Sequence, residues 1–250
     1  MKPLIETLDT NIRLDNKSVL ITGASSGIGR ALSVLCADLG ATVLLSGRNL
    51  DALNETYDLI KSNGNPEPAI LELDLCKATE IEFKNINTVI KTNIGPLHGF
   101  VHCATHITEL GPIRHLGLSE WQDLFKVNVI APALLTRACE PLFEASGSGS
   151  VVLTSDTHAM SLDAYWGGYA VSKSALNAYA TLQSNEWKDE RPYRVNVVTP
   201  GPINSPLRSK THPGEDRNLL RSIDSLLSTY IYLLSDSSSH TSGENFSYPP

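Results

Sequence analysis

The segment Lys17-Ser-Val-Leu-Ile-Thr-Gly-Ala-Ser-Ser-Gly-Ile-Gly29 joins a short apolar run to a glycine-rich turn. Its first six residues are mostly β-branched or apolar, which is typical of a buried strand. From Arg30 to Gly40 the pattern becomes that of an amphipathic helix. Glycines in such a turn let the backbone approach a pyrophosphate, and the free N–H groups of the helix N-terminus bind its negative charge. The segment therefore predicts a dinucleotide site.

The rest of the chain alternates between strand and helix patterns. This alternation is typical of a parallel sheet with helices on both faces and ligands at the carboxyl ends of the strands. We expect an α/β fold, a single Rossmann-type doubly wound domain over residues 1–250 with about seven strands. The expected strands lie near 18–22, 42–46, 69–73, 99–103, 150–154, 194–199 and 245–248, and the expected helices near 28–39, 50–62, 79–91, 119–144, 164–188 and 222–235.

Composition is that of an ordinary globular protein. The 250 residues are 41% hydrophobic and 19% charged, with a net charge of −7 that argues against nucleic acid as a partner. No run approaches the length of a membrane helix, and residues 1–16 lack the apolar centre of a signal peptide. We expect no membrane association. The four cysteines, at 36, 76, 103 and 139, are scattered and predict reduced thiols in a cytoplasmic protein.

The run Tyr169-Ala-Val-Ser-Lys173 lies within the expected helix 164–188 and places a phenol and an ammonium on one face. A nearby positive charge stabilises phenolate and lowers the pKa of a tyrosine from its usual value of about 10. Tyr169 is thus a candidate general acid and base. An amphipathic helix that carries both residues by chance is the alternative for this pair taken alone.

These motifs together resemble the short-chain dehydrogenase/reductase family. The resemblance covers nearly the whole chain, from about Leu14 onward, and in finer detail it is to the YciK-like bacterial subgroup. It is carried by Thr22-Gly23-x-x-x-Gly27-x-Gly29, Asp74-Leu75, Trp121-x-x-x-Phe125-x-Val-Asn128, Tyr169-x-x-x-Lys173 and Thr199-Pro200-Gly201-Pro-Ile203-Asn-Ser205, and for the subgroup by residues 97–102, 153–155, 166–169 and 233–238.

The resemblance implies an NADP(H)-dependent oxidoreductase that reduces a carbonyl or oxidises an alcohol on a small molecule. Tyr169 would be the general acid and base, and Lys173 would lower its pKa and hold the ribose. Asn128 would anchor a water relay, and Ser155 or Asp156 would face the carbonyl. A degenerate family member, which binds dinucleotide or a partner without efficient turnover, is the alternative function.

Arg48 favours NADP over NAD. NAD enzymes place an acidic residue after the second strand, whereas this chain has Gly47 and Arg48, and a guanidinium suits a 2′-phosphate. A solvated loop arginine is the alternative. By resemblance, Asp74 contacts adenine, unless it only caps a helix, and Ile203 and Ser205 hold the carboxamide. The candidate cofactor residues are Gly23, Ser25, Ser26, Gly27, Ile28, Gly29, Arg48, Asp74, Leu75, Ala104, Tyr169, Lys173, Pro200, Gly201, Ile203 and Ser205.

The chain departs from the family pattern in two places. Thr105 replaces a family glycine, so it needs room or a shifted strand end. The family's catalytic serine lies thirteen residues before the tyrosine, where this chain has Asp156, while Ser155 lies fourteen before. A carboxylate about 4 Å from a developing alkoxide would repel it by roughly 4 kcal/mol. We therefore expect a slip or bulge that turns the Ser155 hydroxyl toward Tyr169. A protonated Asp156 and impaired hydride transfer are the alternatives.

Three further features of the sequence give weaker indications of function or assembly. The group His98, His102, Cys103 and His106 lacks the composition of a metal site, and we expect no metal. Arg208, Lys210 and His212 follow the Pro-Gly turn, where they would suit an anionic substrate or form a solvated loop. By resemblance, the helices near 119–144 and 164–188 pair across a two-fold axis, which implies a homodimer or tetramer.

Overall fold

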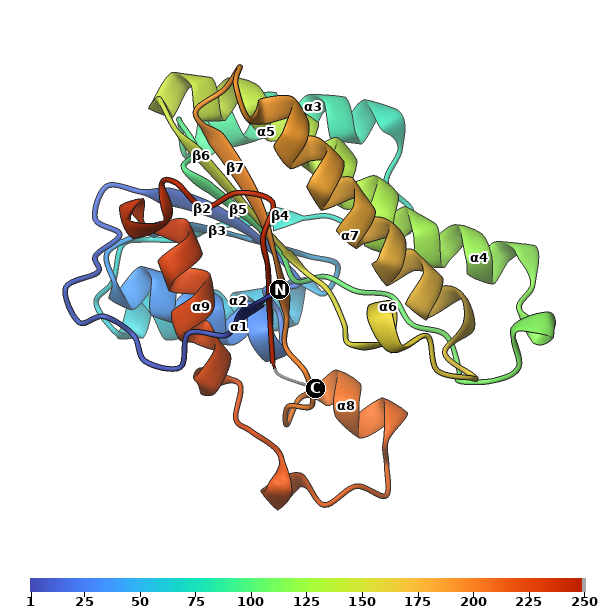
Figure 1. Ribbon diagram of the computed structural model, residues 1–250. Helices are drawn as coiled ribbons and strands as arrows, with labels where there is room; N and C mark the ends of the chain where they lie inside the picture. Colours follow the sequence, from blue (N-terminus) through green and yellow to red (C-terminus); the bar gives the residue numbers. More distant parts are fainter. Residues whose placement is uncertain (249–250) are drawn as a thin grey trace.

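A sheet of parallel strands forms the centre of the molecule, with helices on both faces (Figure 1). In the computed structural model, which describes residues 1–248, the strands follow the order β1-β8-β7-β6-β5-β2-β3-β4. The strands are β1 (Lys2–Pro3), β2 (Ser18–Thr22), β3 (Thr42–Gly47), β4 (Ala69–Glu72), β5 (Gly99–His102), β6 (Gly149–Thr154), β7 (Tyr193–Thr199) and β8 (Asn245–Ser247). The seven expected strands are confirmed, and β1 is an addition that pairs with β8 through Lys2 and Phe246.

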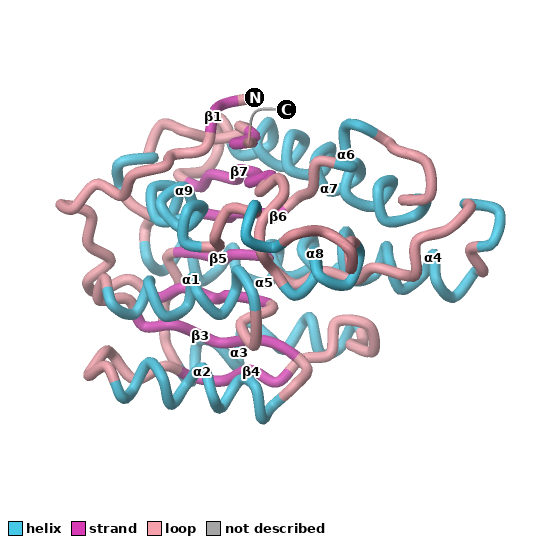
Figure 2. Tube along the Cα trace, turned by 90° about the horizontal axis from the view of Figure 1, so that it is seen from below, coloured by secondary structure: helices cyan, strands magenta, loops and turns pink. Residues whose placement is uncertain are grey.

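Helices occur in the intervals that the sequence predicts. Helices α1, α2 and α9 cover one face of the sheet, and α3, α5 and α7 cover the other (Figure 2). The α-helices are α1 (Gly27–Asp38), α2 (Leu50–Ser62), α3 (Glu80–Asn93), α4 (Leu118–Phe125), α5 (Ala131–Ser146), α6 (His158–Ser161), α7 (Gly167–Trp187), α8 (Pro206–Thr211) and α9 (Asp224–Leu234), with short turns at η1 (Ile113–His115), η2 (Lys126–Ile130), η3 (Arg217–Leu219) and η4 (Asp236–Ser238).

The expected helix 119–144 is interrupted by one π-helical turn, η2, between α4 and α5. Pro132 has no N–H to donate to the carbonyl of Asn128, four residues earlier, so the regular ladder cannot continue through this point. Such single-turn π segments are frequent at functional sites. Here the turn carries Asn128, whose side chain is fully buried.

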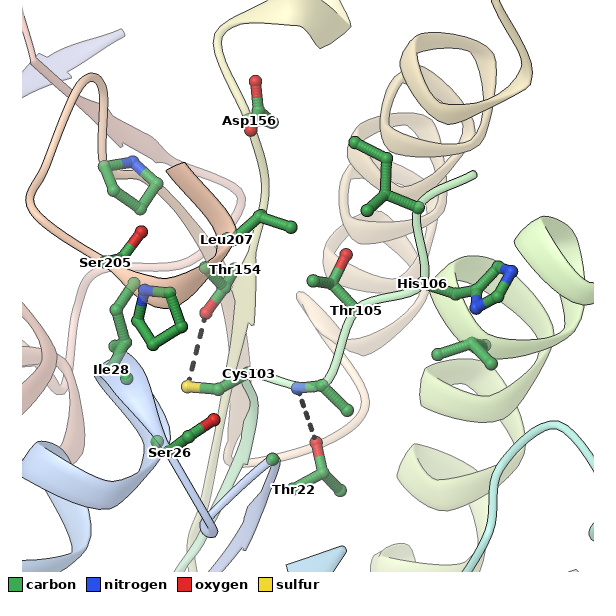
Figure 3. A pocket seen from close by; sticks show the side chains of 18 of the residues that line it. Thr22, Ser26, Ile28, Cys103, Thr105, His106, Thr154, Asp156, Ser205 and Leu207 are labelled. Atoms are coloured by element: carbon green, nitrogen blue, oxygen red, sulfur yellow. Dashed lines mark hydrogen bonds between the residues drawn. The ribbon is translucent and has the colours of Figure 1, made fainter. Parts of the chain in front are cut away.

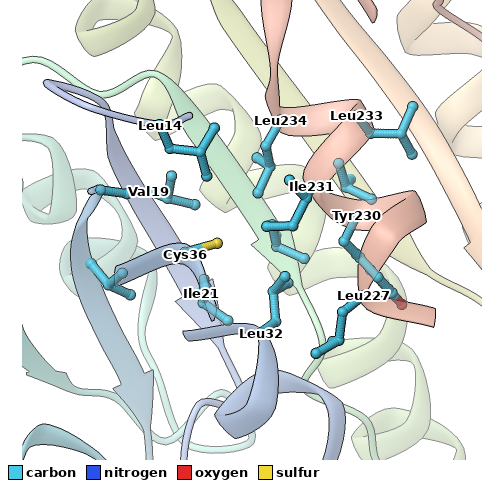
Figure 4. Packing of buried hydrophobic residues seen from close by; sticks show 14 of the residues in the cluster. Leu14, Val19, Ile21, Leu32, Cys36, Leu227, Tyr230, Ile231, Leu233 and Leu234 are labelled. Atoms are coloured by element: carbon cyan, nitrogen blue, oxygen red, sulfur yellow. The ribbon is translucent and has the colours of Figure 1, made fainter. Parts of the chain in front are cut away.

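Alternate residues of each strand pack against opposite layers of helices. In β2, Val19 and Ile21 contact α1 and α9, while Leu20 belongs to the cluster with α3 and α5. Figure 4 shows the first cluster, in which Leu32 of α1 and Ile231 of α9 meet over the strand. Burial on both faces explains why the strands are short continuous apolar runs. Within residues 1–248, no helix has the length and apolar character needed to span a membrane.

Chain order reverses between β2 and β5, because the strands after β2 run outward on one side and those after β5 on the other. In open α/β sheets, ligands bind outside the carboxyl ends of the strands at this reversal. The loops that follow β2, β3, β4, β5, β6 and β7 all open at this edge, and residues from each line the same cleft.

Candidate active site

A cleft of about 500 Å³ lies at the carboxyl edge of the sheet. Every residue that the sequence assigns to cofactor binding lines it, as do Tyr169, Lys173, Ser155 and Asp156. Asn128 is not part of the lining, although its neighbour Val127 is. Figure 3 shows Ser26 of the glycine-rich turn, Thr105 after β5 and Asp156 after β6 around this space.

The glycine-rich turn brings β2 and α1 close to the next loop. Gly23 has a φ of +69°, and a Cβ atom there would lie 2.8 Å from the backbone nitrogen of Ala104. A Cβ atom on Gly29 would lie 2.3 Å from the carbonyl oxygen of Gly23. Neither position accepts a side chain, so the turn stays tight and its first-turn N–H groups remain available. This is a cradle that fits a pyrophosphate.

Arg48 and Asp74 lie at the adjoining strand ends. Arg48 is exposed directly after β3, and its position fits a phosphate at the rim of the cleft. Asp74 accepts the backbone N–H of Cys76 at 3.0 Å, which closes a turn after β4. The helix-cap alternative for Asp74 is wrong, because α3 begins later and is capped by Thr79 and Glu82.

Asp156, and not Ser155, faces the phenol of Tyr169. The Tyr169 hydroxyl donates a 2.9 Å hydrogen bond to Oδ2 of Asp156. Ser155 continues the ladder of β6 by donating its N–H to the carbonyl of Val198 at 2.8 Å. Its buried hydroxyl has no hydrogen-bond partner among residues 1–248. The expected slip is therefore wrong, because the backbone stays in register through Ser155 and no bulge shifts the strict count.

His158 holds the other oxygen of Asp156. Oδ1 accepts the backbone N–H of His158 at 2.9 Å and lies 2.6 Å from Nδ1 of its imidazole. On the far side of the ring, Nε2 lies 3.8 Å from Oδ2 of Asp163. Trp166 stacks on the imidazole with ring centroids 3.4 Å apart and an angle of 17° between the planes. Tyr169, Asp156 and His158 thus form one hydrogen-bonded row.

His158 is the site residue that sequence reasoning missed. The spacing of Asp156-Thr-His158 could have indicated a contact between the two residues, since an aspartate side chain readily accepts the backbone N–H of a residue two positions later. Neither α6, which begins at His158, nor the stack on Trp166 has a strong sequence pattern. Only the folded loop brings these groups together.

Burial and Asp156 set the proton affinity of Tyr169. Burial, followed by the charge and hydrogen bond of Asp156, raises the pKa of Tyr169 well above 10. The expectation that Lys173 lowers this pKa is not met in the free protein. For Asp156, burial acts to raise the pKa, but hydrogen bonds from His158 and Tyr169 outweigh it and the pKa is lowered. The phenol is therefore held as a proton donor beside a carboxylate.

Lys173 lies beneath Tyr169 and is directed to the backbone. Its Nζ donates to the carbonyl of Thr154 at 2.8 Å and lies 5.9 Å from the centroid of the Tyr169 ring. The side chain is buried, and burial lowers the pKa of Lys173 to about 8. The carbonyl of Thr154 engages only one of the three N–H donors of the Lys173 ammonium. The other N–H groups can bind a ligand in the cleft.

Asn128 has all of its side-chain capacity engaged within the protein. Oδ1 accepts from the N–H of His106 at 2.8 Å and from the hydroxyl of Thr105 at 3.3 Å. Nδ2 donates to the carbonyl of His106 and to the hydroxyl of Ser172, each at 2.9 Å. An asparagine amide offers two donors and two acceptor positions, so this set is complete.

The structure also bears on the room that Thr105 needs and on the basic residues of α8. Thr105 needs no shifted strand end, because β5 ends at His102 and the Thr105 hydroxyl turns to Asn128. Arg208 is engaged by Glu215 through bonds of 2.6 and 2.7 Å, which reduces its use for an anionic substrate. Lys210 is exposed and also lines the cleft.

Comparisons with known proteins agree with this geometry. The family described as short chain dehydrogenase matches residues 17–216. An uncharacterized oxidoreductase, YciK of Escherichia coli K12, is 32% identical over 95% of this chain and 93% of its own. A putative short chain dehydrogenase from E. coli CFT073, solved with NADPH, superposes with a TM-score of 0.91 at 32% identity and covers 97% of this chain and 100% of its own. A putative short chain dehydrogenase from Shigella flexneri 2a, solved with NADP, superposes with a TM-score of 0.90 at 32% identity. The match covers 95% of this chain and 98% of that protein's chain.

Proposed function

Because this chain belongs to the short-chain dehydrogenase/reductase family as a YciK-like oxidoreductase, we propose that it uses NADP(H) to reduce a carbonyl or oxidise an alcohol, with Tyr169 as general acid and base. One observation carries the proposal: a single cleft unites the glycine-rich turn, Arg48 and the Tyr169–Lys173 pair. The relatives solved with NADPH and NADP support the choice of dinucleotide.

The residues of the cleft fit the cofactor. The turn from Gly23 to Gly29 would bind the pyrophosphate, and Arg48 would bind the 2′-phosphate that distinguishes NADP. Ile203 and Ser205 line the end of the cleft where the carboxamide would lie. When bound, NADPH supplies the hydride for the reduction.

Tyr169 would supply the proton. Hydride addition to a carbonyl carbon leaves an alkoxide, which takes the phenolic proton of Tyr169. Once its hydroxyl turns from Asp156 to the substrate, the neutral phenol can also polarise the carbonyl before that transfer, which replaces part of the role of the family serine. Lys173 would hold the ribose through the N–H groups that Thr154 leaves free. Binding without turnover is not favoured, because Tyr169 and Lys173 both lie in the dinucleotide cleft.

The cleft and the cysteines also bear on the kind of substrate and on the cell compartment. The substrate would be a small molecule that enters beside Trp166 and α8, which line the outer part of the cleft. The four unpaired cysteines support a reducing compartment, and we propose a cytoplasmic location.

A direct experiment measures NADPH binding by calorimetry and then NADPH consumption with a panel of aldehydes and ketones. The proposal expects binding and turnover of at least one carbonyl. Tyr169→Phe should bind NADPH like the unmodified chain and lose on the order of 10²–10⁴-fold in turnover. Failure to bind NADPH, or equal turnover by Tyr169→Phe, would contradict it.

A further inference from the structure

The row from Tyr169 through Asp156 to His158 runs along the cleft, which all three residues line, toward a more exposed end. Tyr169 is 2% exposed, while the side chain of His158 is 13% exposed and that of Asp163, at the outer end, is 59% exposed. Hydrogen bonds join the three residues. The Tyr169 hydroxyl lies 2.9 Å from Oδ2 of Asp156, and Oδ1 of Asp156 lies 2.6 Å from Nδ1 of His158. Unbroken hydrogen bonds of this kind form a path along which a proton can move.

From this path we propose that His158 resupplies the proton of Tyr169 through Asp156, and we call these three residues the His158 relay. The proposal rests on the oxidoreductase function proposed above. It makes Asp156 and His158 positioning and proton-transfer groups that act through Tyr169. The aspartate, which stands where the family has serine, then has a defined role in the reaction.

Charge explains why a resupply path is needed. When Tyr169 gives its proton to an alkoxide, the resulting phenolate faces the carboxylate of Asp156 across a 2.9 Å contact. Two negative charges at that separation repel strongly in a buried site. The phenolate therefore raises the proton affinity of Asp156, which draws the shared proton from Nδ1 of His158. Repulsion between the two anions is removed as soon as this proton moves.

The transfers balance. Hydride addition reduces the carbonyl carbon, and the electron pair on its oxygen takes the Tyr169 proton. Oδ1 of Asp156 takes the Nδ1 proton of a neutral His158 while Nε2, on the side that faces Asp163, takes a proton from solvent, and rotation of the neutral carboxyl group passes the proton of Asp156 to the phenolate. A turn of the imidazole ring then places its N–H opposite Asp156 again. Alcohol oxidation runs the same transfers in reverse.

Several other titratable groups lie around His158. Asp156 and Asp163 face the imidazole from the same segment of the chain. Tyr169 of α7 lies beyond Asp156. On the other side of Trp166 lies His212, at the end of α8. The Arg208–Glu215 pair lies next to His212. Burial, followed by the charge of Arg208, lowers the pKa of His212.

The decisive variant is His158→Asn, because the amide of asparagine can donate to Asp156 but cannot carry a proton onward. NADPH affinity should be unchanged, while turnover should fall on the order of 10²-fold and lose its rise toward low pH. His158→Gly should regain turnover with added imidazole. The matched control His240→Asn, at an exposed position beyond η4, should behave like the unmodified chain.

Two measurements on the unmodified chain keep the proposal falsifiable if a variant fails to fold. A proton inventory in mixtures of H₂O and D₂O should be curved, since more than one proton moves. The imidazole nitrogen resonances of the free protein should show Nδ1 of His158 protonated. A linear inventory, an unprotonated Nδ1, or His158→Asn turnover with an unchanged pH profile would overturn the relay. Absence of turnover in the unmodified chain would instead overturn the proposed function, and the relay with it.

Discussion

The phenolic oxygen of Tyr169 lies 2.9 Å from Oδ2 of Asp156, and the other oxygen of that carboxylate is held by the backbone and imidazole of His158. A carboxylate thus occupies the place where a neutral hydroxyl would polarise a carbonyl. This arrangement keeps Tyr169 protonated in the free protein, because both burial and the adjacent charge disfavour phenolate. It also makes His158 part of the reaction.

Asp156→Asn should lower the pKa of Tyr169. Burial, which keeps this pKa above 10, is unchanged in the variant, but the negative charge that raises it further is removed. Ultraviolet difference titration against Tyr169→Phe measures the phenolate directly. Phenolate should appear at lower pH in Asp156→Asn than in the unmodified chain, and Asp189→Asn, at an exposed position just beyond α7, should have no effect. An unchanged Tyr169 titration would mean that the carboxylate does not govern the phenol.

Asp156→Ser should reduce turnover rather than restore it. The serine hydroxyl fits the family pattern, but it cannot pass a proton from His158 to Tyr169. We expect a loss on the order of 10²-fold, and His158→Asn should add little in this background, since residues that act as one unit are not additive. Steady-state kinetics of the two single variants and the double variant measure the coupling. A large rise in turnover by Asp156→Ser would show that the carboxylate opposes catalysis.

Much of the fold could be predicted because its signals are local. The buried run before Gly23 and the apolar periodicity of α1 are strong patterns, and alternation of strands and helices fixes the parallel sheet. Strand β1 could not be predicted, since Lys2–Pro3 are exposed and pair only because β8 lies beside them. The π turn at Asn128 was also missed, as helical periodicity continues across it.

The sequence predicted most of the residues that line the candidate site, but it missed His158 and did not predict the contacts among them. Sequence spacing placed Tyr169 and Lys173 on one helix face, but the direction of the Lys173 ammonium depends on the carbonyl of Thr154. The slip at Ser155 was expected because an alkoxide disfavours a carboxylate. Hydrogen bonds from His158 nevertheless hold the Asp156 carboxylate beside Tyr169.

Arg48 should select NADPH over NADH. A guanidinium paired with the 2′-phosphate contributes roughly 1.5–3 kcal/mol, so Arg48→Ala should lose this preference while NADH affinity changes little. Calorimetric titration with both dinucleotides measures the difference. Arg191→Ala, an exposed position at the opposite edge of the sheet, removes the same charge and serves as the control. Equal affinities in the unmodified chain, or a preference that survives in Arg48→Ala, would contradict the assignment.

The chain should form a dimer or tetramer through α5 and α7. Leu182 on α7 is 63% exposed and Ile130, just before α5, is 47% exposed, which leaves apolar surface on this side of the molecule. Light scattering at micromolar concentration should give a multiple of the chain mass. Leu182→Glu should shift the population toward monomer, whereas Leu219→Glu, at a residue 84% exposed on η3, should not. A monomer in the unmodified chain would refute this prediction.

The most direct test of the account follows the hydride itself. The chain is mixed in a single turnover with NADPH that carries deuterium at the reactive carbon of the nicotinamide and with a carbonyl substrate from the panel, and the alcohol is analysed by mass spectrometry. The account predicts deuterium on the new carbinol carbon, with Tyr169→Phe binding the dinucleotide but forming far less labelled alcohol. Tight NADPH binding with no labelled alcohol from any carbonyl would contradict the claim that this cleft is an active site.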